Sequence, residues 1–416
     1  MDAYRPRVAD QELTEWMKTM GAVLIEGPKA CGKTMTAERV AATSYYFDED
    51  VNARQAVDLD PDSLFAGPAP ILFDEWQLAP AIWNRVRRQV DARHAKGLAL
   101  LTGSATPRDD TSRHSGAGRI GVLRMRPMSL WESGHSTGSA SLAALFDGET
   151  PSGRDSGLTV RDLVQRIVIG GWPSLLDVEE TEARRWLSGY VRNAIEVDIP
   201  ALGARRDPRN LRRLLAALAR GVGQPVKINA LAVDVGGDRG PVATSAIYAY
   251  LDALERLMLL DNSEAWLPHM RSRLRLRTSP VRYFVDPSLG TAALEVGSTE
   301  LLADLNATGY HFEALVVRDL RIYAQALGGT VGTWRDESGH EIDAIVTLPG
   351  GRWGAFEVKL NPKAVDEAAQ SLLRFAAKVD TSKVGSPTVL GVVTSTGFAG
   401  RRPDGVTVLP ITTLAP

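Results

Sequence analysis

The sequence predicts an α/β protein in which a parallel sheet occupies the N-terminal third and is followed by a helical region and a second α/β region. Short apolar runs such as 23–25 and 71–73 alternate with amphipathic stretches, which is typical of buried parallel strands joined by helices. From 158 to 260 the apolar residues recur at helical spacing. After residue 331, strand-like runs return on both sides of the helical stretch 363–379.

These changes of pattern predict the domain boundaries of the chain, whose 416 residues leave room for about two to four domains. The segment 136–157 is rich in Ser, Gly and Thr, and we expect it to be a flexible linker or insertion. The predicted domains are an N-terminal α/β domain at 1–135, a helical region at 158–225, a winged-helix-like region at 226–286 and a C-terminal α/β domain at 287–416.

The first apolar run leads into the segment GPKACGKT, which fits the phosphate-binding pattern GxxxxGK[ST] at every fixed position. Gly27 and Gly32 let the backbone curl so that its N–H groups point at one anion. We expect Lys33 to neutralise the β- and γ-phosphates of ATP and the Thr34 hydroxyl to coordinate Mg²⁺. The predicted ATP-binding residues are Gly27, Pro28, Lys29, Ala30, Cys31, Gly32, Lys33, Thr34 and Met35.

Cys31, the single cysteine of the chain, lies inside this phosphate loop. Its thiol has two interpretations. Beside Lys33 and the start of a helix it would be reactive and would be shielded by bound MgATP. Facing inward, it would pack as a small apolar side chain, as most free cysteines do. A chain with one cysteine has no internal disulfide and no cysteine-based zinc site.

The apolar run 71–73 ends in two acids, Asp74 and Glu75. A strand would bring Asp74 to the carboxyl edge of the sheet, where its carboxylate can hold Mg²⁺ through water. Glu75 follows directly and is placed to polarise the water that attacks the phosphate. An Asp-Glu pair after a strand is common, but downstream of a phosphate loop it indicates an ATP-hydrolysing site.

Two further catalytic candidates come from the next strand, 98–104, which ends in Thr102 and Ser104. Either hydroxyl would reach the γ-phosphate or the attacking water, and the alternative is a Ser/Thr cap on a turn. Arg119 is the candidate for an arginine finger, supplied in cis or by a neighbouring subunit of a homo-oligomer. The alternative for Arg119 is an ordinary surface arginine.

A basic region with a winged-helix outline is predicted near residues 227–282. Two helical stretches flank the Gly-rich turn 236–240, and strand-like residues follow. Between residues 201 and 282 there are 14 Lys and Arg against 7 Asp and Glu. Four arginines at a spacing of two would share one face of a strand, either to contact DNA phosphates or as a solvated or internally paired strand. They are Arg271, Arg273, Arg275 and Arg277.

A second set of charged residues lies in the C-terminal α/β domain. Glu357 and Lys359 are two apart on a predicted strand, so both face one side, and Asp343 lies on the preceding strand. Glu313, on a predicted helix, completes the set. Acids that hold a metal beside a lysine that orients water are what a Mg²⁺-dependent phosphodiesterase uses, with Asp343 and Glu357 as metal ligands. The alternative is a set of solvent-facing strand residues.

Composition limits the class of protein and its compartment. The chain is 44% apolar and 24% charged with a formal net charge of −2, so a nucleic-acid surface would have to be local. No run of 18 or more apolar residues occurs. The N-terminus, MDAYRPRVADQE, lacks the apolar core of a signal peptide. We therefore expect a cytoplasmic protein with no membrane partner.

Several motifs occur together in this chain. They are GPKACGKT (27–34), ILFDEWQLAP (71–80), LLTGSA (100–105), RPMSLWE (126–132), GGWP (170–173) and EIDAI with FEVK (341–345 and 356–359). With them the chain resembles a prokaryotic family of AAA-type P-loop ATPases with a C-terminal domain of unknown function. The resemblance extends from about residue 13 to about residue 375.

The resemblance implies a P-loop ATPase domain, a winged helix and a restriction-endonuclease-like α/β domain, in that order. The nuclease motif of the last domain ends in acid-x-Lys, which Glu357 and Lys359 match, and Asp343 and Glu313 stand at the usual preceding places. The Ser/Gly-rich insert after Glu132 is longer than the connection typical of the family.

Three hypotheses about function follow. The first is a Mg²⁺-dependent ATP hydrolase whose nucleotide state controls the C-terminal module, acting on double-stranded DNA. The second is a DNA-binding nuclease or regulator that uses ATP as a switch. The third is a catalytically inactive protein that binds ATP and serves as a platform for partners. The intact pair Asp74 and Glu75 behind a complete phosphate loop favours hydrolysis over binding alone.

Overall fold

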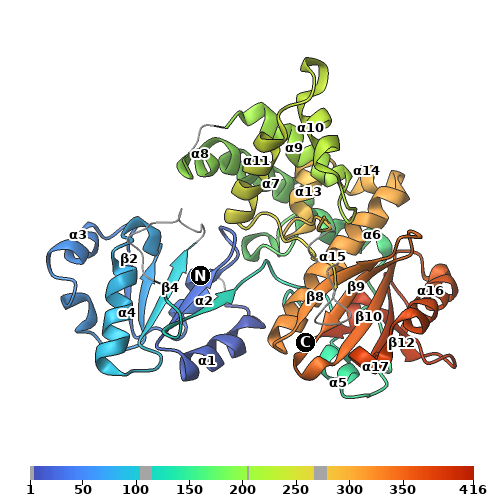
Figure 1. Ribbon diagram of the computed structural model, residues 1–416, viewed down its shortest axis with the longest axis horizontal. Helices are drawn as coiled ribbons and strands as arrows, with labels where there is room; N and C mark the ends of the chain where they lie inside the picture. Colours follow the sequence, from blue (N-terminus) through green and yellow to red (C-terminus); the bar gives the residue numbers. More distant parts are fainter. Residues whose placement is uncertain (1–3, 104–114, 204–205, 267–278) are drawn as a thin grey trace. The chain divides into compact units, whose positions relative to one another are not determined.

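A computed structural model describes residues 4–103, 115–203, 206–266 and 279–416. The chain divides into two compact units (Figure 1). The first unit comprises Met1–Pro127 with the short piece Arg256–Met258, and the second comprises Met128–Glu255 and Leu259–Pro416. Among the described helices, none combines the length and apolar character that crossing a membrane requires.

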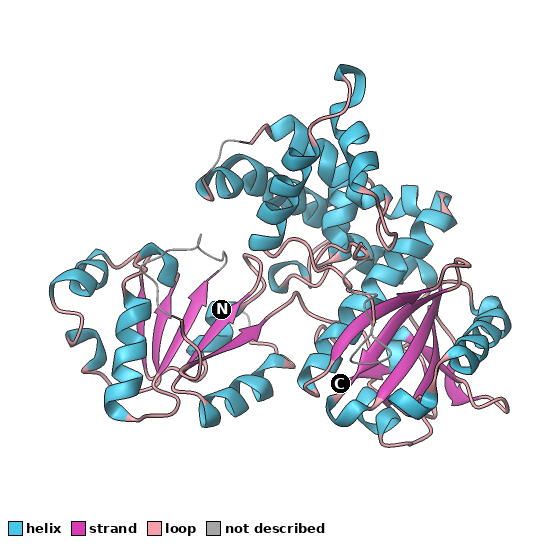
Figure 2. Cartoon of the chain, viewed as in Figure 1, coloured by secondary structure: helices cyan, strands magenta, loops and turns pink. Residues whose placement is uncertain are grey.

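The first unit is built on a parallel sheet with strand order β2-β3-β4-β1-β5 (Figure 2). The strands are β1 (Ala22–Glu26), β2 (Thr43–Tyr46), β3 (Ile71–Asp74), β4 (Ala99–Gly103) and β5 (Ile120–Arg124). The helices are α1 (Ala9–Thr19), α2 (Lys33–Glu38), α3 (Val51–Leu59) and α4 (Ile82–Arg93), with single turns η1 (Ser63–Phe65) and η2 (Trp76–Leu78). Every pairing is parallel, so the carboxyl ends of β1, β3 and β4 meet at one edge.

Aromatic packing on β3 fixes the position of the strand that ends in the two acids. Phe73 is fully buried, and its ring lies 5.4–5.9 Å from those of Tyr45, Phe47 and Phe65. Directly after the acids, Trp76 is buried against Trp83 of α4 with ring centroids 5.0 Å apart. Each large ring removes enough apolar surface from water to stabilise the strand end.

Helix α2, which follows the phosphate loop, ends at Glu38. The chain leaves the helix there since the N–H of Ala42 donates to the Pro70 carbonyl at 2.8 Å, which starts the pairing of β2 with β3.

The second unit begins with a helical region. Its helices are α6 (Val160–Ile169), α7 (Glu180–Asn193), the π-helix η4 (Ala194–Asp198), α8 (Ile199–Ala201), α9 (Pro208–Arg220), α10 (Ile228–Gly236), α11 (Thr244–Arg256), α13 (Pro287–Leu294) and α14 (Ser298–Ala303), with single turns η3 (Pro173–Leu175) and η5 (Gly237–Arg239). Sequence signals mark their starts: Thr159 and Asp162 form a capping box on α6, and Asp207 caps α9 with a proline at its first position.

The segment expected to be a winged helix contains α10, a turn and α11, followed by two bridged segments. Leu260 pairs with Phe284 and Ser263 pairs with Val281, both antiparallel. The exposed face of α11 includes Tyr248 and Asp252, and its single basic residue is Arg256 in the last turn. The winged-helix assignment itself stays a prediction.

The C-terminal part of the second unit is a mixed sheet with strand order β7-β12-β13-β11-β10-β9-β8. The strands are β8 (Thr330–Arg335), β9 (Glu341–Thr347), β10 (Trp353–Lys359), β11 (Val389–Thr394), β12 (Phe398–Arg401) and β13 (Thr407–Pro410). The neighbouring helices are α15 (Leu305–Ala326), α16 (Val365–Lys378) and α17 (Thr381–Val384), with single turns η6 (Pro349–Gly351), η7 (Pro362–Ala364) and η8 (Ile411–Thr413). The predicted fold class is confirmed as a parallel-sheet α/β domain, a helical region and a further α/β sheet.

Residues 136–157, expected to be a flexible linker or insertion, are built into this second unit instead. They form β6 (Ala140–Ser141), α5 (Leu142–Phe146) and β7 (Gly153–Arg154). Strand β6 pairs in parallel with β14 (Leu414–Ala415), and β7 pairs with β12. The Ser and Gly content that suggests a linker supplies turns and side-chain hydrogen bonds, such as that from Ser136 Oγ to the Leu414 carbonyl at 2.6 Å.

A buried ionic network explains two of the motifs that the sequence singles out. Arg318 of α15 donates to Asp286 at 2.8 Å and to Asp319 at 2.7 Å, and all three side chains are buried. The second oxygen of Asp319 accepts from the N–H of Leu130 in RPMSLWE, and Asp286 accepts from the N–H of Gly171 in GGWP, each at 3.0 Å. These motifs hold the second unit together.

Candidate functional site

The phosphate loop leaves β1 and turns sharply before α2. Gly32 has φ 101°, a conformation that favours glycine, and Ala30 also lies in the left-handed region at φ 62°. Gly27 is needed for space, because an added Cβ would lie 2.4 Å from the Met125 carbonyl oxygen. These left-handed residues curl the backbone, as is required for successive N–H groups to form a concave anion-binding site.

Lys33 is buried beneath this loop. Its Nζ donates to the carbonyls of Gly27 at 3.0 Å and Pro28 at 2.9 Å. These carbonyls hold the ammonium group inside the loop, so a bound phosphate would be met by a charge that is already in position.

Asp74 connects the phosphate loop to the neighbouring strands. Thr34 Oγ1 donates to Asp74 Oδ1 at 2.9 Å, and the hydroxyl of Thr102 donates to the same oxygen. Burial raises the pKa of Asp74, and the hydrogen bonds from Thr102 and Thr34 oppose that shift. The structure thus brings Thr34, Asp74 and Thr102 together, although Thr102 faces Asp74 and its contact with a phosphate stays a prediction.

The donors present here fit Mg²⁺, which prefers hard oxygen ligands and keeps several waters. A hydroxyl and a carboxylate, from Thr34 and Asp74, lie within hydrogen-bond distance of each other beside the phosphate loop. Across the described ranges, no three His, Cys, Asp or Glu side chains gather closely enough to hold a metal. An ion at this site would therefore take its remaining ligands from water and phosphate.

Glu75, the predicted general base, has an unusual backbone. Its φ of 52° and ψ of 45° place a non-glycine residue in the left-handed region between β3 and η2. Such strain is found mostly where the surrounding structure fixes a functional side chain. Gln77 donates its amide to the Glu75 carboxylate. Burial raises the pKa of Glu75, while Gln77 and the charge of Lys33 act against it.

The structure does not bring Arg119 to the phosphate loop. The carbonyl of Arg119 accepts from the N–H of Ala22 at the beginning of β1, whereas the loop follows the end of that strand. Its side chain is 44% exposed and pairs with Asp91 of α4 at 2.9 Å. An arginine finger supplied in cis therefore does not fit this geometry, and supply from a neighbouring subunit stays a prediction.

Cys31 follows the inward-packed interpretation. Its side chain is fully buried, and its Sγ lies 3.0 Å from the Cβ position of Gly27. Lys29 and Met35, by contrast, are exposed.

Ser104 and the arginines of the expected DNA-contacting strand lie outside the described residues, so their predicted roles stay predictions. These are Arg271, Arg273, Arg275 and Arg277.

Sequence reasoning missed the segment that precedes α1. Arg7 is buried and donates from Nη1 to the Cys31 carbonyl and from Nη2 to the Arg126 carbonyl, each at 2.7 Å. Tyr4 donates to Asp10 at 2.5 Å and lies 3.0 Å from Thr36 Oγ1 of α2. No spacing signal in the sequence connects residues 4–10 to a loop more than 20 residues away.

The acids and lysine of the C-terminal domain also come together. Antiparallel pairing of β9 with β10 places Phe356 opposite Ala344, beside Glu357 and Asp343, and Asp343 Oδ2 accepts from the N–H of Val358 at 2.7 Å. Lys359 donates to Glu357 at 2.8 Å. Burial and the nearby Glu357 charge raise the pKa of Asp343 to about 7. Burial lowers the pKa of Lys359, but the carboxylates of Asp343 and Glu357 outweigh it and raise that pKa.

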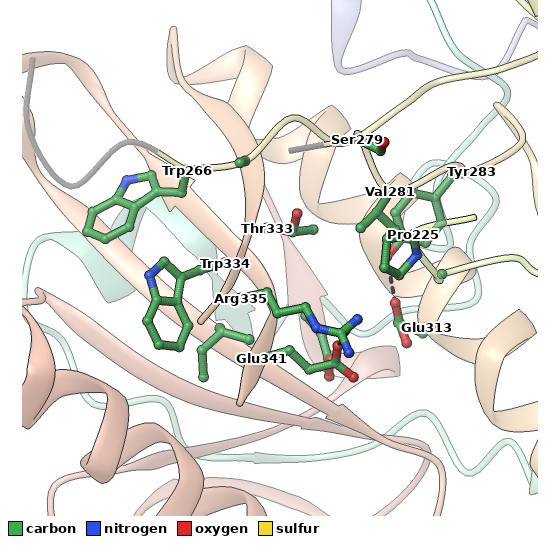
Figure 3. A pocket seen from close by; sticks show the side chains of 14 residues that line it. Pro225, Trp266, Ser279, Val281, Tyr283, Glu313, Thr333, Trp334, Arg335 and Glu341 are labelled. Carbon is green, nitrogen blue, oxygen red and sulfur yellow. Dashed lines mark hydrogen bonds and ion pairs between the residues drawn. The ribbon is translucent and has the colours of Figure 1, made fainter. Parts of the chain in front are cut away.

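Glu313 reaches the same cluster from α15. Tyr283 donates to Glu313 Oε1 at 2.5 Å, as Figure 3 shows in the pocket beside the cluster. Asp343 and Glu313 both line this pocket, together with Pro225, Arg335 and other residues. Burial raises the pKa of Glu313 well above its usual value, and the Asp343 charge adds to the effect. A neutral Glu313 is a poor metal ligand and a good hydrogen-bond partner.

A serine and a histidine that the sequence analysis missed orient Glu357. Ser371 of α16 donates to Glu357 Oε1 at 2.7 Å, and His340 Nε2 lies 2.9 Å from the Ser371 hydroxyl. Because a serine has one hydroxyl proton, the histidine nitrogen must donate to it. The spacing of charged residues along two strands does not indicate Ser371, because Ser371 lies on α16, outside those strands.

Comparison with known proteins divides the chain into three matched parts. Residues 19–133 match the family described as AAA domain. Residues 160–300 match Domain of unknown function (DUF8612), and residues 308–414 match Domain of unknown function (DUF4143). Among solved structures, the Walker-type ATPase PABY2304 of Pyrococcus abyssi is similar at 14% identity over 70% of this chain and 99% of that chain, with a TM-score of 0.41. Comparison with curated proteins finds no match.

The N-terminal part of the chain is thus similar to the AAA domain family, and its C-terminal part is similar to the DUF4143 family. This confirms the coarser part of the resemblance seen in the motifs.

Proposed function

We propose that the first unit hydrolyses ATP with Mg²⁺. The observation that supports this most directly is the hydrogen bond between Thr34 of the phosphate loop and Asp74 at the end of β3. This hydrogen bond lies at one edge of a parallel sheet, where residues suited to bind phosphate and a metal ion and to orient water come together. Glu75 follows Asp74 directly, in a fixed, strained conformation. The AAA family match to residues 19–133 agrees with this role.

Each residue has a distinct part in the proposed reaction. The Lys33 ammonium group would donate hydrogen bonds to the β- and γ-phosphates. Thr34 and Asp74 would hold Mg²⁺, which neutralises charge on the phosphate oxygens when bound. Glu75 would orient the attacking water and accept its proton as the bond between the γ-phosphorus and the bridging oxygen breaks. The raised pKa of Glu75 makes its carboxylate a stronger base than a solvated glutamate.

The test measures MgATP binding and phosphate release by the purified full chain. Lys33→Ala should abolish binding, whereas Glu75→Gln should keep binding and lower turnover by about 100-fold or more. Glu49→Gln, which changes an exposed acid elsewhere in the same unit, is the matched control. Unchanged turnover in Glu75→Gln would contradict the general-base role.

A second function, hydrolysis of a phosphodiester, is favoured by two contacts: Asp343 accepts from the N–H of Val358, next to Glu357, and Lys359 forms an ion pair with Glu357. Under this proposal the two acids would hold Mg²⁺ or Mn²⁺ and Lys359 would orient water or stabilise charge on the phosphate. We also propose that the nucleotide state of the first unit controls this module, with double-stranded DNA as the partner. An inactive platform that binds ATP is the alternative.

Plasmid DNA with Mg²⁺ or Mn²⁺ tests this second function. Wild-type protein should nick the plasmid, and Asp343→Ala should remove the nicking because it removes a proposed metal ligand. Asp380→Ala, in an exposed turn of the same unit, should leave it unchanged. Equal nicking by the wild type and Asp343→Ala would indicate contamination, and absence of nicking with both metals would favour the platform alternative.

A further inference from the structure

Arg7 contacts the phosphate loop through the backbone carbonyl of Cys31. It is 7% exposed, and its two terminal nitrogens donate to two different backbone carbonyls at 2.7 Å each. One carbonyl belongs to Cys31 within the loop, and the other belongs to Arg126 after β5. A guanidinium group can make both contacts at once because its donors are fixed in one plane.

The contact with Cys31 determines the direction of a neighbouring N–H. The Cys31 carbonyl and the Gly32 N–H belong to one planar trans peptide, so they point in opposite directions. Holding the carbonyl on the Arg7 side therefore directs the Gly32 N–H away from Arg7, toward the hollow of the loop. Gly32 has φ 101° and, as a glycine, meets little steric resistance to rotating this peptide. The sequence of the loop alone does not fix that orientation.

Arg7 is itself held in place by its own segment. Its N–H donates to Asp10 Oδ2 at 2.9 Å, and Tyr4 donates to the other oxygen of Asp10. The Tyr4 hydroxyl also lies 3.0 Å from Thr36 of α2, and the Arg39 guanidinium lies over the Tyr4 ring at 4.5 Å. The segment 4–10 is therefore attached to the phosphate loop at Cys31 and to α2 at Thr36.

We propose that Arg7 is a positioning residue for phosphate binding, which fixes the Cys31–Gly32 peptide so that the Gly32 N–H is available to a nucleotide phosphate. This inference rests on the proposed nucleotide binding of the first unit. The positive charge of Arg7 on the carbonyl also polarises the same peptide and strengthens its N–H as a donor.

The experiment measures the affinity of the full chain for MgATP, MgADP and inorganic tripolyphosphate. Arg7→Met keeps the length and apolar stem of the side chain but removes both donors. We expect it to weaken all three ligands by about tenfold or more, because the loss lies at the phosphates. Arg7→Lys, which can reach one carbonyl, should recover part of the affinity. Tyr4→Phe removes the neighbouring hydroxyl contacts and should change affinity by less than about threefold.

Three outcomes decide the matter. The positioning role is supported if Arg7→Met loses affinity and Arg7→Lys recovers part of it. The midpoint of thermal unfolding of Arg7→Met, measured without ligand, should then equal that of the wild type. Wild-type affinity in Arg7→Met overturns it while the proposed nucleotide binding stands. No binding by the wild type overturns the proposed function and this inference together. If Arg7→Met does not fold, the comparison of Arg7→Lys with Tyr4→Phe decides, and equal affinities in those two variants overturn the role.

Discussion

Some residues of the first unit are predicted to contact the nucleotide, and others hold the side chains of the site in place. The sequence distinguishes these two roles poorly. Asp74 accepts hydrogen bonds from Thr34 and Thr102, so one carboxylate connects the first turn of α2 to β4. The hydroxyl of Thr102 donates to Asp74, and its contact with the γ-phosphate or the attacking water stays a prediction. The spacing of residues along a strand gives the edge at which a side chain emerges, but the partner it meets there depends on the neighbouring strand.

Cys31 provides a test at the residue scale. Because its side chain is fully buried, we expect the folded protein to react with maleimide far more slowly than the denatured protein, with or without MgATP. Mass spectrometry of adducts over time measures this. Rapid labelling of the folded chain would show that the phosphate loop opens readily and would contradict the packed position of the thiol.

The proposed catalytic residues beside the phosphate loop could be predicted from the sequence, and the residue that supports the loop from outside it could not. Lys33, Thr34, Asp74 and Glu75 belong to short patterns whose chemistry requires those types in that order. Arg7 reaches the loop through tertiary packing, which leaves no spacing in the sequence. Arg119 pairs with Asp91 of α4, a contact that its position before β5 does not indicate, and its role as a finger from a neighbouring subunit stays a prediction.

At the scale of elements, the loop that contains GGWP packs directly on the segment that contains RPMSLWE. The N–H of Met128 donates to the Gly171 carbonyl at 2.6 Å. Gly171 has no room for a side chain, since an added Cβ would lie 2.0 Å from the Met128 carbonyl oxygen. The fold of strands and helices was largely predictable from periodicity, but this contact joins segments that no local pattern relates.

Gly171→Ala should therefore destabilise the second unit by about 3 kcal/mol or more, because a backbone carbonyl must move. Gly189→Ala is the matched control, because Gly189 lies in α7 with no atom within 4 Å of the added Cβ. That change should stabilise the helix by about 0.5–1 kcal/mol. Urea unfolding measures both, and equal stability of the two variants would contradict the close packing of GGWP.

At the scale of the whole molecule, stability is expected to depend on pH through a buried histidine. His311 in α15 is 2% exposed, and among the described residues its Nδ1 finds no hydrogen-bond partner. Burial lowers its pKa from 6.5 to about 4 in the folded protein. The unfolded chain therefore takes up a proton at a higher pH than the folded chain, and protonation favours unfolding.

The stability contributed by neutral His311 should be present above pH 6.5 and lost as the pH falls toward 4. The size of the loss is about 3 kcal/mol, from the difference between the two pKa values. Urea unfolding across this pH range, compared between the wild type and His311→Phe, isolates the effect. His311→Phe should flatten the dependence in this window, and an identical slope in both proteins would show that His311 does not titrate on unfolding.

The pairing of β6 with β14 has a consequence for biosynthesis. Ala140 lies beside Leu414, so residues soon after the first unit find their strand partner about 270 residues later in the chain. The ribosome adds residue 414 long after it has made the phosphate-loop segment, so that segment can begin to fold during translation. During this time β6 has no partner strand. Until then, the buried residues Ala140 and Leu142 are exposed to chaperones and proteases. A message that ends before residue 414 would therefore yield a chain in which β6 has no partner strand.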